Sequence, residues 1–398
     1  MHAFEYCVPT NIVFGKDSVT HVAEQIRRCG AQRVLVVYGG QSAKKSGLLD
    51  RVCRLLQDGG IEFQLLGGVH PNPRLGFARE GVKQAIAMDA ELILAVGGGS
   101  VIDTCKAISI GKANPDTDIW DFWTGKKELV RTIPVGVILT IPAAGSETSN
   151  SAVLTDEVNL EKRSLNVEPN RPAFAIMDPT LAATLPNRQV ACGVADIMMH
   201  TLERYFNPVD GNETTMQLAE AVLRVTIANG PAAYENPADY DAMSEIMWCG
   251  SLSHNGLTGL GGLRSFTVHP MGHSLSEKFD IIHGESLTAL WASWARYNLH
   301  AKPELFARYA RNVWGIAEPD AEKAANAGID ATEAYFRSLH LPVCLGELSC
   351  GVQDEAGLDD LAARTSFHGT RCIGALIQLD TAQIREIFAM ANHEGAPL

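Results

Sequence analysis

The sequence lacks features that would assign it to a membrane or to nucleic acid. It contains no run of 18 consecutive apolar residues, which argues against a membrane-spanning helix. The first residues, MHAFEYCVPTN, have no basic segment followed by an apolar run, so we expect no secretory signal. Lysine and arginine number 33 against 46 acidic residues, for a net charge of −13. This balance argues against binding to nucleic acid or to an anionic membrane surface, because both require basic patches.

The cysteines are too scattered to form a disulfide framework or a cysteine-rich zinc site. There are nine of them, an odd number, from Cys7 to Cys372, and no C-x-x-C pair occurs. Such usage is typical of a reducing compartment, so we expect a cytoplasmic protein.

The two halves of the chain have different hydrophobic patterns. At 398 residues with 46% hydrophobic and 20% charged residues, the sequence predicts two globular domains. Short runs rich in Val, Ile and Leu predict buried parallel strands, and helical patterns separate them. The predicted strands are 33–38, 61–66, 91–96 and 136–142, the predicted helices 44–57, 75–88 and 100–110, and a hairpin is expected within 150–177.

Helical periodicity dominates after Pro186, and no alternation of strands and helices returns. We therefore predict an α/β dinucleotide-binding domain with a parallel sheet at residues 1–185 and an all-helical domain at 186–398, with the boundary near 180–187. The loop at 118–125 holds Trp120, Phe122 and Trp123, which either line an apolar pocket or simply pack.

A triple-glycine turn, AVGGGSVIDTCKAI (95–108), connects a predicted strand to a predicted helix. Glycines let a backbone approach a phosphate closely, and a helix N-terminus offers free N–H groups to an anion. Serine is a good N-cap, so a helix start at this serine is expected. The turn matches neither G-x-G-x-x-G nor a P-loop, and a tight turn that merely needs glycine is the alternative. The predicted pyrophosphate cradle consists of Gly97, Gly98, Gly99 and Ser100; Lys106, further along the helix, is equally compatible with solvent.

Two further loops follow predicted strands, and ligands of open α/β sheets bind at the carboxyl ends of strands. In YGGQSAKKSG (38–47) no acidic residue occurs before Asp50, whereas an NAD site usually has one to bind the ribose 2′-hydroxyl. This favours NADP over NAD, although Lys44 and Lys45 also suit a solvated helix start. The candidate contacts here are Gly39, Gly40 and Ser42, and in IPAAGSETSN (141–150) they are Gly145, Ser146 and Thr148.

The second half carries a cluster of imidazoles and a carboxylate. Asp196 and His200 are four residues apart on a predicted helix and so share one face. Further on, His269, His273 and His283 follow the spacing H-x3-H-x9-H. Each alone is more often a satisfied polar residue, but together they suit a divalent zinc or iron held by nitrogen and oxygen. A site without cysteine favours a catalytic metal with one position open to a substrate oxygen.

Together these motifs resemble the iron-containing, or group III metal-dependent, alcohol dehydrogenase family. The resemblance covers almost the whole chain, although Val8 replaces the family's asparagine, and it is closest to NADPH-dependent aldehyde reductases and butanol dehydrogenases. It implies a dehydroquinate-synthase-like architecture with a dinucleotide-binding and a metal-binding domain. The motifs are PTNIVFGKDSV (9–19), VHPNPRL (69–75), GGGSVID (97–103), IPAAGSE (141–147), the D-x3-H pair and the three histidines.

The resemblance also implies roles for individual residues. The implied metal ligands of an Fe(II) or Zn(II) ion are Asp196, His200, His269 and His283. The resemblance puts His273 near the nicotinamide as a non-ligand, Lys162 near the nicotinamide side, Thr140 against the cofactor, and Asp103 near the carboxamide end. It further implies a homodimer.

We therefore expect a metal-dependent oxidoreductase that interconverts primary alcohols and aldehydes by hydride transfer, with His273 moving the proton. Glycerol-dehydrogenase-like oxidation of polyols with NAD is one alternative, but such enzymes lack the D-x3-H pair. A dehydroquinate-synthase-like lyase would need a cluster of basic residues, and 260–290 contains only Arg264 and Lys278. A non-catalytic nucleotide-binding module with a structural metal is the third alternative.

Overall fold

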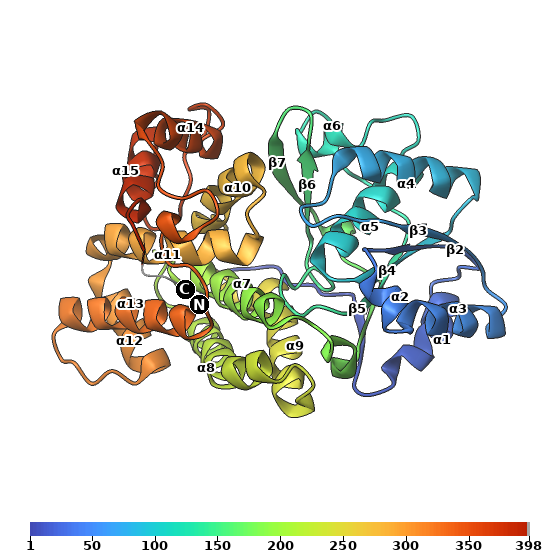
Figure 1. The fold of residues 1–398 in the computed structure, drawn as a ribbon, viewed down its shortest axis with the longest axis horizontal. Helices are drawn as coiled ribbons and strands as arrows, with labels where there is room; N and C mark the ends of the chain where they lie inside the picture. The colour runs from blue at the N-terminus through green and yellow to red at the C-terminus, as the bar shows by residue number, and fades with distance from the viewer. Residues whose placement is uncertain (396–398) are drawn as a thin grey trace. The chain divides into compact units, whose positions relative to one another are not determined.

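The computed structural model describes residues 1–395 and divides into two compact units (Figure 1). The α/β unit comprises 7–185 and 236–251, and the helical unit comprises 1–6, 186–235 and 252–398. Two short segments do not follow a single boundary after residue 185: residues 1–6 belong to the helical unit, and residues 236–251 belong to the α/β unit. His2 donates its N–H to Asn212 Oδ1 at 2.9 Å, and Trp248 packs edge-on against Phe14 with ring centroids 6.4 Å apart. Such contacts join residues over 200 positions apart, so hydrophobic periodicity cannot reveal them.

The predicted parallel sheet is confirmed. Six strands lie in the order β1-β8-β5-β4-β2-β3, all parallel, and the inner strands are buried except at Arg33, the first residue of β2. Their Val, Ile, Leu and Ala side chains explain this, because both faces of such a sheet are covered by helices. The strands are β1 (Asn11–Phe14), β2 (Arg33–Tyr38), β3 (Glu62–Gly67), β4 (Leu92–Gly97), β5 (Val135–Leu139) and β8 (Phe174–Met177).

The helices of this unit follow the predicted alternation with two differences. The predicted helix at 44–57 is two helices, because Gly47 between them has a φ of 75°. The predicted loop at 118–125 contains a short helix in which Trp123 is buried and donates its indole N–H to Ala152 O at 3.0 Å. These aromatic residues therefore serve packing. The helices are α1 (Val22–Arg28), α2 (Ser42–Lys45), α3 (Leu48–Asp58), α4 (Leu75–Ala87), α5 (Gly99–Ala113) and α6 (Trp120–Trp123).

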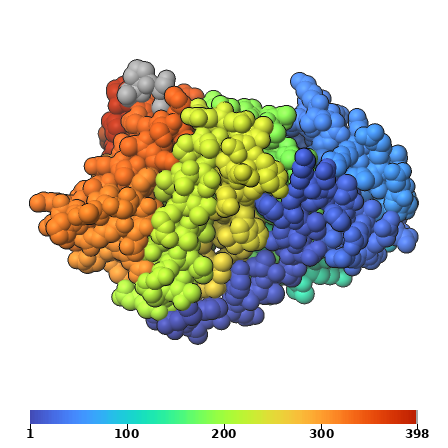
Figure 2. Space-filling model, turned by 90° about the horizontal axis from the view of Figure 1, so that it is seen from below, coloured from blue at the N-terminus to red at the C-terminus, as the bar shows by residue number. Residues whose placement is uncertain are grey.

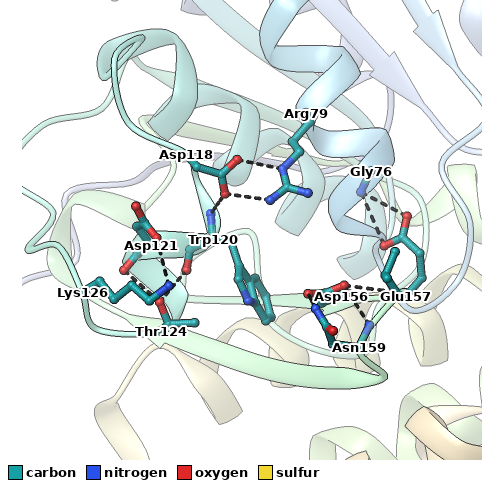
Figure 3. A network of polar contacts seen from close by, with 11 residues as sticks. Gly76, Arg79, Asp118, Trp120, Asp121, Thr124, Lys126, Asp156, Glu157 and Asn159 are labelled. Atoms are coloured by element: carbon teal, nitrogen blue, oxygen red, sulfur yellow. Dashed lines mark hydrogen bonds and ion pairs between the residues drawn. The ribbon is translucent and has the colours of Figure 1, made fainter.

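The predicted hairpin forms a separate antiparallel pair, β6 (Ser151–Asp156) and β7 (Glu161–Asn166). Polar contacts fasten its tip to the start of α4, as Figure 3 shows. Glu157 accepts the N–H of Gly76 at 3.1 Å, where a carboxylate suits the positive end of the helix dipole. Arg79, one turn further along α4, makes a two-fold hydrogen bond of 2.8 Å to Asp118. The hairpin and the segment before α6 are thus both fixed to the same helix.

The second unit is helical, as predicted. Its core is aromatic: Phe206 stacks on Phe306 with centroids 4.2 Å apart, and Trp291 and Tyr309 are fully buried beside them. Figure 2 shows α8, in yellow-green, running beside the orange helices α12 and α13. The helices are α7 (Asn187–Tyr205), α8 (Glu213–Glu235), α9 (Tyr240–His254, which begins in the α/β unit), α10 (Val268–Phe279), α11 (His283–Asn298), α12 (Pro303–Trp314), α13 (Ala321–Ser338), α14 (Glu355–Thr365) and α15 (Thr381–Ala391).

No helix within residues 1–395 is both long enough and apolar enough to cross a membrane.

Candidate metal centre and nucleotide-binding edge

Three helices of the helical unit bring the predicted metal ligands together. Asp196 and His200 lie one turn apart in the middle of α7, where both side chains are buried. His269 is the second residue of α10, and His283 is the first residue of α11. Because side chains near a helix start stand clear of the following turns, α10 and α11 can aim both imidazoles at one face of α7.

The candidate ligand atoms of Asp196, His200 and His269 lie close enough together to share a single cation, and His283 lies near one of them, Asp196. Asp196 Oδ1 lies 3.2 Å from His200 Nδ1, 3.5 Å from His269 Nε2 and 3.8 Å from His283 Nε2. Atoms bound at zinc distances in a tetrahedron are roughly 3.4 Å apart. The Asp196, His200 and His269 ligand atoms all lie within 4.8 Å of one another.

Three of these atoms are buried without a hydrogen-bond partner among the described residues: Asp196 Oδ1, His200 Nδ1 and His269 Nε2. Buried polar atoms are nearly always paired, so three orphaned atoms converging on one point indicate a ligand. A carboxylate oxygen with imidazole nitrogens, and no sulfur, is a donor set that zinc and iron accept. The residues present therefore fit a divalent metal.

The pKa values of the two buried histidines, His200 and His269, are shifted in opposite directions. Burial, reinforced by His254 and His269, holds the pKa of His200 well below its usual range, so this ring is neutral. Burial also acts to lower the pKa of His269, but Glu203 and Asp196 outweigh it and raise the pKa to about 9. A metal must displace the resulting proton from His269, as is usual when binding competes with protonation.

The ligand cluster has one more exposed side. The side chains of Asp196, His200 and His269 are 5–6% exposed, whereas that of His283 is 27% exposed. His273 is half-buried beside it, with ring centroids 5.6 Å apart. The cluster is therefore not sealed on all sides, as a catalytic site requires and a structural zinc site does not.

Three side chains beside the predicted ligands were missed in the sequence: Glu203, Arg204 and His254. Glu203, seven residues after Asp196 on the same face of α7, contacts the ring of His269. Arg204 donates to His200 O at 2.6 Å and contacts His254 Nδ1 at 2.9 Å, and the ring of His254 lies 3.9 Å from that of His200. The i, i+4, i+7 spacing of acid, histidine and acid on α7 would have pointed to Glu203. No local pattern pointed to His254.

The predicted nucleotide contacts lie at the carboxyl edge of the sheet. The connections from β2 and from β4 run in opposite directions along the strand order, which makes the gap between these two strands the switch point where such sheets bind ligands. Gly39 and Gly40 follow β2, Gly97 ends β4, and Thr140 follows β5. Thr140 donates its N–H to Gly97 O at 3.1 Å, so these loops meet.

Gly97 and Gly98 are needed by the protein's own packing as well as by any phosphate. A Cβ on Gly97 would lie 2.5 Å from Val101 Cγ2, and one on Gly98 would lie 2.9 Å from Ile141 Cβ. The expected Ser100 cap was wrong: Gly98 is the N-cap, α5 begins at Gly99, and Ser100 is in the first turn. The first N–H groups of α5 still point out of the helix, where an anion can bind them.

Several predicted cofactor contacts are occupied within the protein. Asp103 is buried and accepts hydrogen bonds from the Ser146 hydroxyl at 2.5 Å and from Val153 N at 2.9 Å. Lys162, also buried, donates to Asn72 Oδ1 at 2.9 Å. These side chains hold the 141–153 segment and β7 in place. Ser42 and Gly40, by contrast, are exposed at the start of α2.

Lys106 is fully buried, so it does not face solvent. Its Nζ donates to Ser146 O and Oγ at 2.8 Å, Ser149 O at 3.2 Å and Ser151 O at 2.6 Å. Burial lowers the pKa of Lys106 to about 8, against the opposing effect of Asp103 and Glu147. This lysine therefore fastens the 146–151 segment to α5.

Comparison with known proteins identifies the family of this chain. The family model described as iron-containing alcohol dehydrogenase matches residues 9–179, and the model of its C-terminal part matches residues 189–392. The chain belongs to the iron-containing alcohol dehydrogenase family. The resemblance inferred from the motifs is thereby confirmed.

Relatives within this family are similar over nearly their full length. NADH-dependent butanol dehydrogenase A of Clostridium acetobutylicum is 39% identical over 98% of this chain and 99% of its own. NADPH-dependent aldehyde reductase YqhD of Escherichia coli is 34% identical over 98% of this chain and all of its own. The crystal structure of NADH-dependent butanol dehydrogenase A from Thermotoga maritima superposes with a TM-score of 0.94, at 32% identity and 99% coverage of both chains.

Proposed function

We propose that this member of the iron-containing alcohol dehydrogenases is a metal-dependent oxidoreductase that reduces aldehydes to primary alcohols with NADPH and runs the reverse reaction as metabolites dictate. Interconversion of alcohols and aldehydes with a nicotinamide cofactor is the chemistry of its relatives, which include butanol dehydrogenases and an aldehyde reductase. The observation that carries the proposal is the convergence of orphaned ligand atoms in the helical unit. The partial exposure of His283 on one side of the cluster favours this chemistry over a nucleotide-binding module with a structural metal.

In this proposal Asp196, His200, His269 and His283 hold one divalent ion, Fe(II) or Zn(II). Bound there, the ion supplies Lewis-acid polarisation of a carbonyl oxygen. The protein would contribute one negative charge and three neutral nitrogens, which would leave a bound divalent ion with net positive charge. Burial of Asp196, His200 and His269 keeps water away from three of the four ligands and so strengthens that field.

We assign the proton transfer to His273. It lies one turn after His269 on α10, it is half-buried on the exposed side of the cluster, and its ring is 5.6 Å from that of His283. A histidine's ordinary pKa suits it to release a proton near neutral pH and to take one up again in the reverse direction.

The α/β unit would hold the dinucleotide, with the pyrophosphate against the first turn of α5 at Gly98, Gly99 and Ser100. The nicotinamide supplies the hydride. Preference for NADPH is supported by the segment 38–49, which has no carboxylate, and by Lys44, which lies 5.2 Å from the ring centroid of Tyr38 at this edge. Relatives of both preferences exist, so a ratio of kcat/KM for NADPH over NADH above one is the result that this assignment requires.

We further propose a homodimer that works in the cytoplasm. All nine cysteines are free, which suits a reducing compartment. Light scattering coupled to size-exclusion chromatography measures the assembly directly, and a monomeric mass would contradict the dimer.

The function is tested by adding NADPH and butanal and following the nicotinamide absorbance. We expect turnover that a chelator abolishes and that Fe(II) or Zn(II) restores. A chelator-insensitive rate would contradict the metal mechanism, and cofactor binding without any turnover would favour the nucleotide-binding module. His273→Ala should keep the metal but slow turnover or shift its pH profile, so an unchanged profile would remove His273 from the proton path.

A further inference from the structure

Glu203 makes a set of contacts that the metal cluster alone does not explain. Its side chain is 1% exposed and lies on the same face of α7 as Asp196 and His200. Glu203 Oε1 accepts the N–H groups of Thr267, at 2.6 Å, and of Val268. Glu203 Oε2 lies 2.6 Å from Nδ1 of His269. One buried carboxylate thus contacts three consecutive residues of another helix start.

The chemistry of this contact determines which nitrogen of His269 faces the cluster. An ionised carboxylate only accepts hydrogen bonds, so Nδ1 of His269 must carry the proton that it donates to Glu203. When the ring is neutral, Nε2 then keeps its lone pair. This is the nitrogen that lies 3.5 Å from Asp196 Oδ1 and has no hydrogen-bond partner among the described residues. The lone pair therefore points to where a cation would be bound.

The same carboxylate also fixes the distance between two ligand-bearing helices. Thr267 is the N-cap of α10 and Val268 its first residue, so Glu203 stands at the positive end of that helix. No side-chain hydrogen bond of Thr267 itself caps α10, so Glu203 supplies the acceptor from α7. Movement of α10 away from α7 would break all three contacts at once.

We propose that Glu203 is a positioning residue that holds His269 in the tautomer and place needed for metal binding, and so sets the affinity of the site. The inference deepens the proposed metal centre and rests on it. Carboxylates that orient a metal-binding histidine typically change the metal affinity 10- to 100-fold when they are removed.

Glu203→Gln tests the tautomer with almost no change in shape. If the amide oxygen keeps the bonds to Thr267 and Val268, the amide NH₂ faces Nδ1 of His269. A donor at that place forces the proton of a neutral ring onto Nε2, the nitrogen meant for the metal. We expect the affinity for Zn(II) to fall about 10- to 100-fold.

Glu203→Asp is the conservative variant. It keeps a carboxylate and hence the tautomer, but it withdraws the acceptor by one methylene group. We expect a metal affinity closer to that of the unmodified protein than the glutamine variant has. An aspartate variant that binds no better than the glutamine variant would overturn the tautomer argument.

Glu347→Gln is the matched control in the same unit. Glu347 is also a buried carboxylate, which accepts Val343 N at 2.8 Å and Arg337 Nη1 at 2.7 Å, but it contacts no histidine of the cluster. The Glu347→Gln variant should have a lower thermal midpoint in its metal-free form but an unchanged affinity for metal.

The measurement is competition of the metal-free proteins with a chromophoric chelator for Zn(II), together with the visible spectrum of the Co(II)-loaded proteins and their thermal midpoints. The inference is supported if Glu203→Gln alters the Co(II) spectrum and weakens binding more than Glu203→Asp does, while Glu347→Gln leaves the affinity unchanged. Unchanged affinity in Glu203→Gln, or an equal loss in Glu347→Gln, overturns it. If the unmodified protein binds no metal at all, the proposed metal centre fails, and this inference falls with it.

Discussion

The metal cluster and the nucleotide-binding edge differ in whether their buried polar side chains have hydrogen-bond partners within the protein. In the helical unit, Asp196, His200 and His269 are buried with ligand atoms that lack a partner among the described residues. In the α/β unit, Asp103 and Lys106 are equally buried, but every polar atom that the structure shows on them is committed to the protein itself. One region is left incomplete, and the other is already satisfied.

This difference follows from the two ligands. A cation is bound by side-chain lone pairs, so its site must contain polar atoms that nothing else uses. A dinucleotide phosphate is bound largely by backbone N–H groups at a helix start and by the absence of side chains. The polar side chains near that turn are then free to hold the loops, as Asp103 and Lys106 do. The predictions below are ordered by expected effect and test this division.

The largest effect is expected for Asp196→Asn. Asp196 Oδ1 lies within 3.8 Å of a nitrogen in each of His200, His269 and His283. Removing its charge should abolish stoichiometric metal binding and lower kcat/KM by more than about 100-fold. Metal analysis after dialysis and aldehyde-dependent NADPH oxidation measure both.

The division also requires that this variant bind NADPH with an affinity within about two-fold of the unmodified protein, as judged from cofactor fluorescence. A large loss of NADPH affinity would show that the two sites are not separate.

Gly284→Ala tests how the helix that carries His283 is positioned. A Cβ at this position would lie 2.7 Å from the Cα and the carbonyl oxygen of Cys192 on α7. Backbone cannot yield as a flexible side chain does, so α11 must move away and take His283 with it. We expect a loss of about 1–3 kcal/mol in the free energy of unfolding and about tenfold weaker metal binding, measured by denaturation and chelator competition.

Gly328→Ala is its control, because a Cβ there would lie 2.7 Å from Ala310 Cβ between α12 and α13. It should destabilise the protein similarly and leave metal binding intact. Equal metal loss in both variants would refute a local role for Gly284.

Gly98→Ala tests the other region. The added Cβ would lie 2.9 Å from Ile141 Cβ and disturb the turn that starts α5. NADPH should bind several-fold more weakly, while metal content stays stoichiometric. Calorimetric titration with NADPH and metal analysis measure the two.

The comparison variant is Gly111→Ala, near the far end of α5, where a Cβ would lie 2.3 Å from Val82 Cγ2. It should cost stability without weakening NADPH binding. If Gly111→Ala weakens binding as much, the turn has no special part in it.

The smallest effect concerns the pH dependence of stability. Burial lowers the pKa of Lys106 to about 8 from its ordinary 10.5. Between these values the unfolded chain holds a proton that the folded chain has released, so the contribution of Lys106 to the free energy of unfolding rises with pH across this window. The rise should be on the order of 2 kcal/mol.

Lys106→Met should lack this rise, as measured by denaturation at pH 8 and at pH 10. A variant that instead kept the slope and lost NADPH affinity would place the lysine at the ligand rather than inside the protein.

Local features of the sequence were sufficient for much of the fold and of the two sites. The parallel sheet followed from short apolar runs, and β2 was predicted at its observed bounds, 33–38. The glycine turn and the Asp196–His200 pair were visible because each lies within one or two turns of chain, where spacing determines which side chains share a face. Gly47 shows the limit of such patterns, since its left-handed conformation divides a segment that reads as one helix.

What only the tertiary structure decided joins residues far apart in the chain. Packing decides that residues 1–6 belong to the helical unit and residues 236–251 to the α/β unit. It also decides that Lys106 is buried and that Glu203 contacts His269. The sequence by itself determined which residues are able to bind a cation or a phosphate, because that ability belongs to the side chain and its local spacing. Whether such a residue is left unpaired for a ligand or is used up inside the protein depends on neighbours that only folding brings within hydrogen-bonding distance.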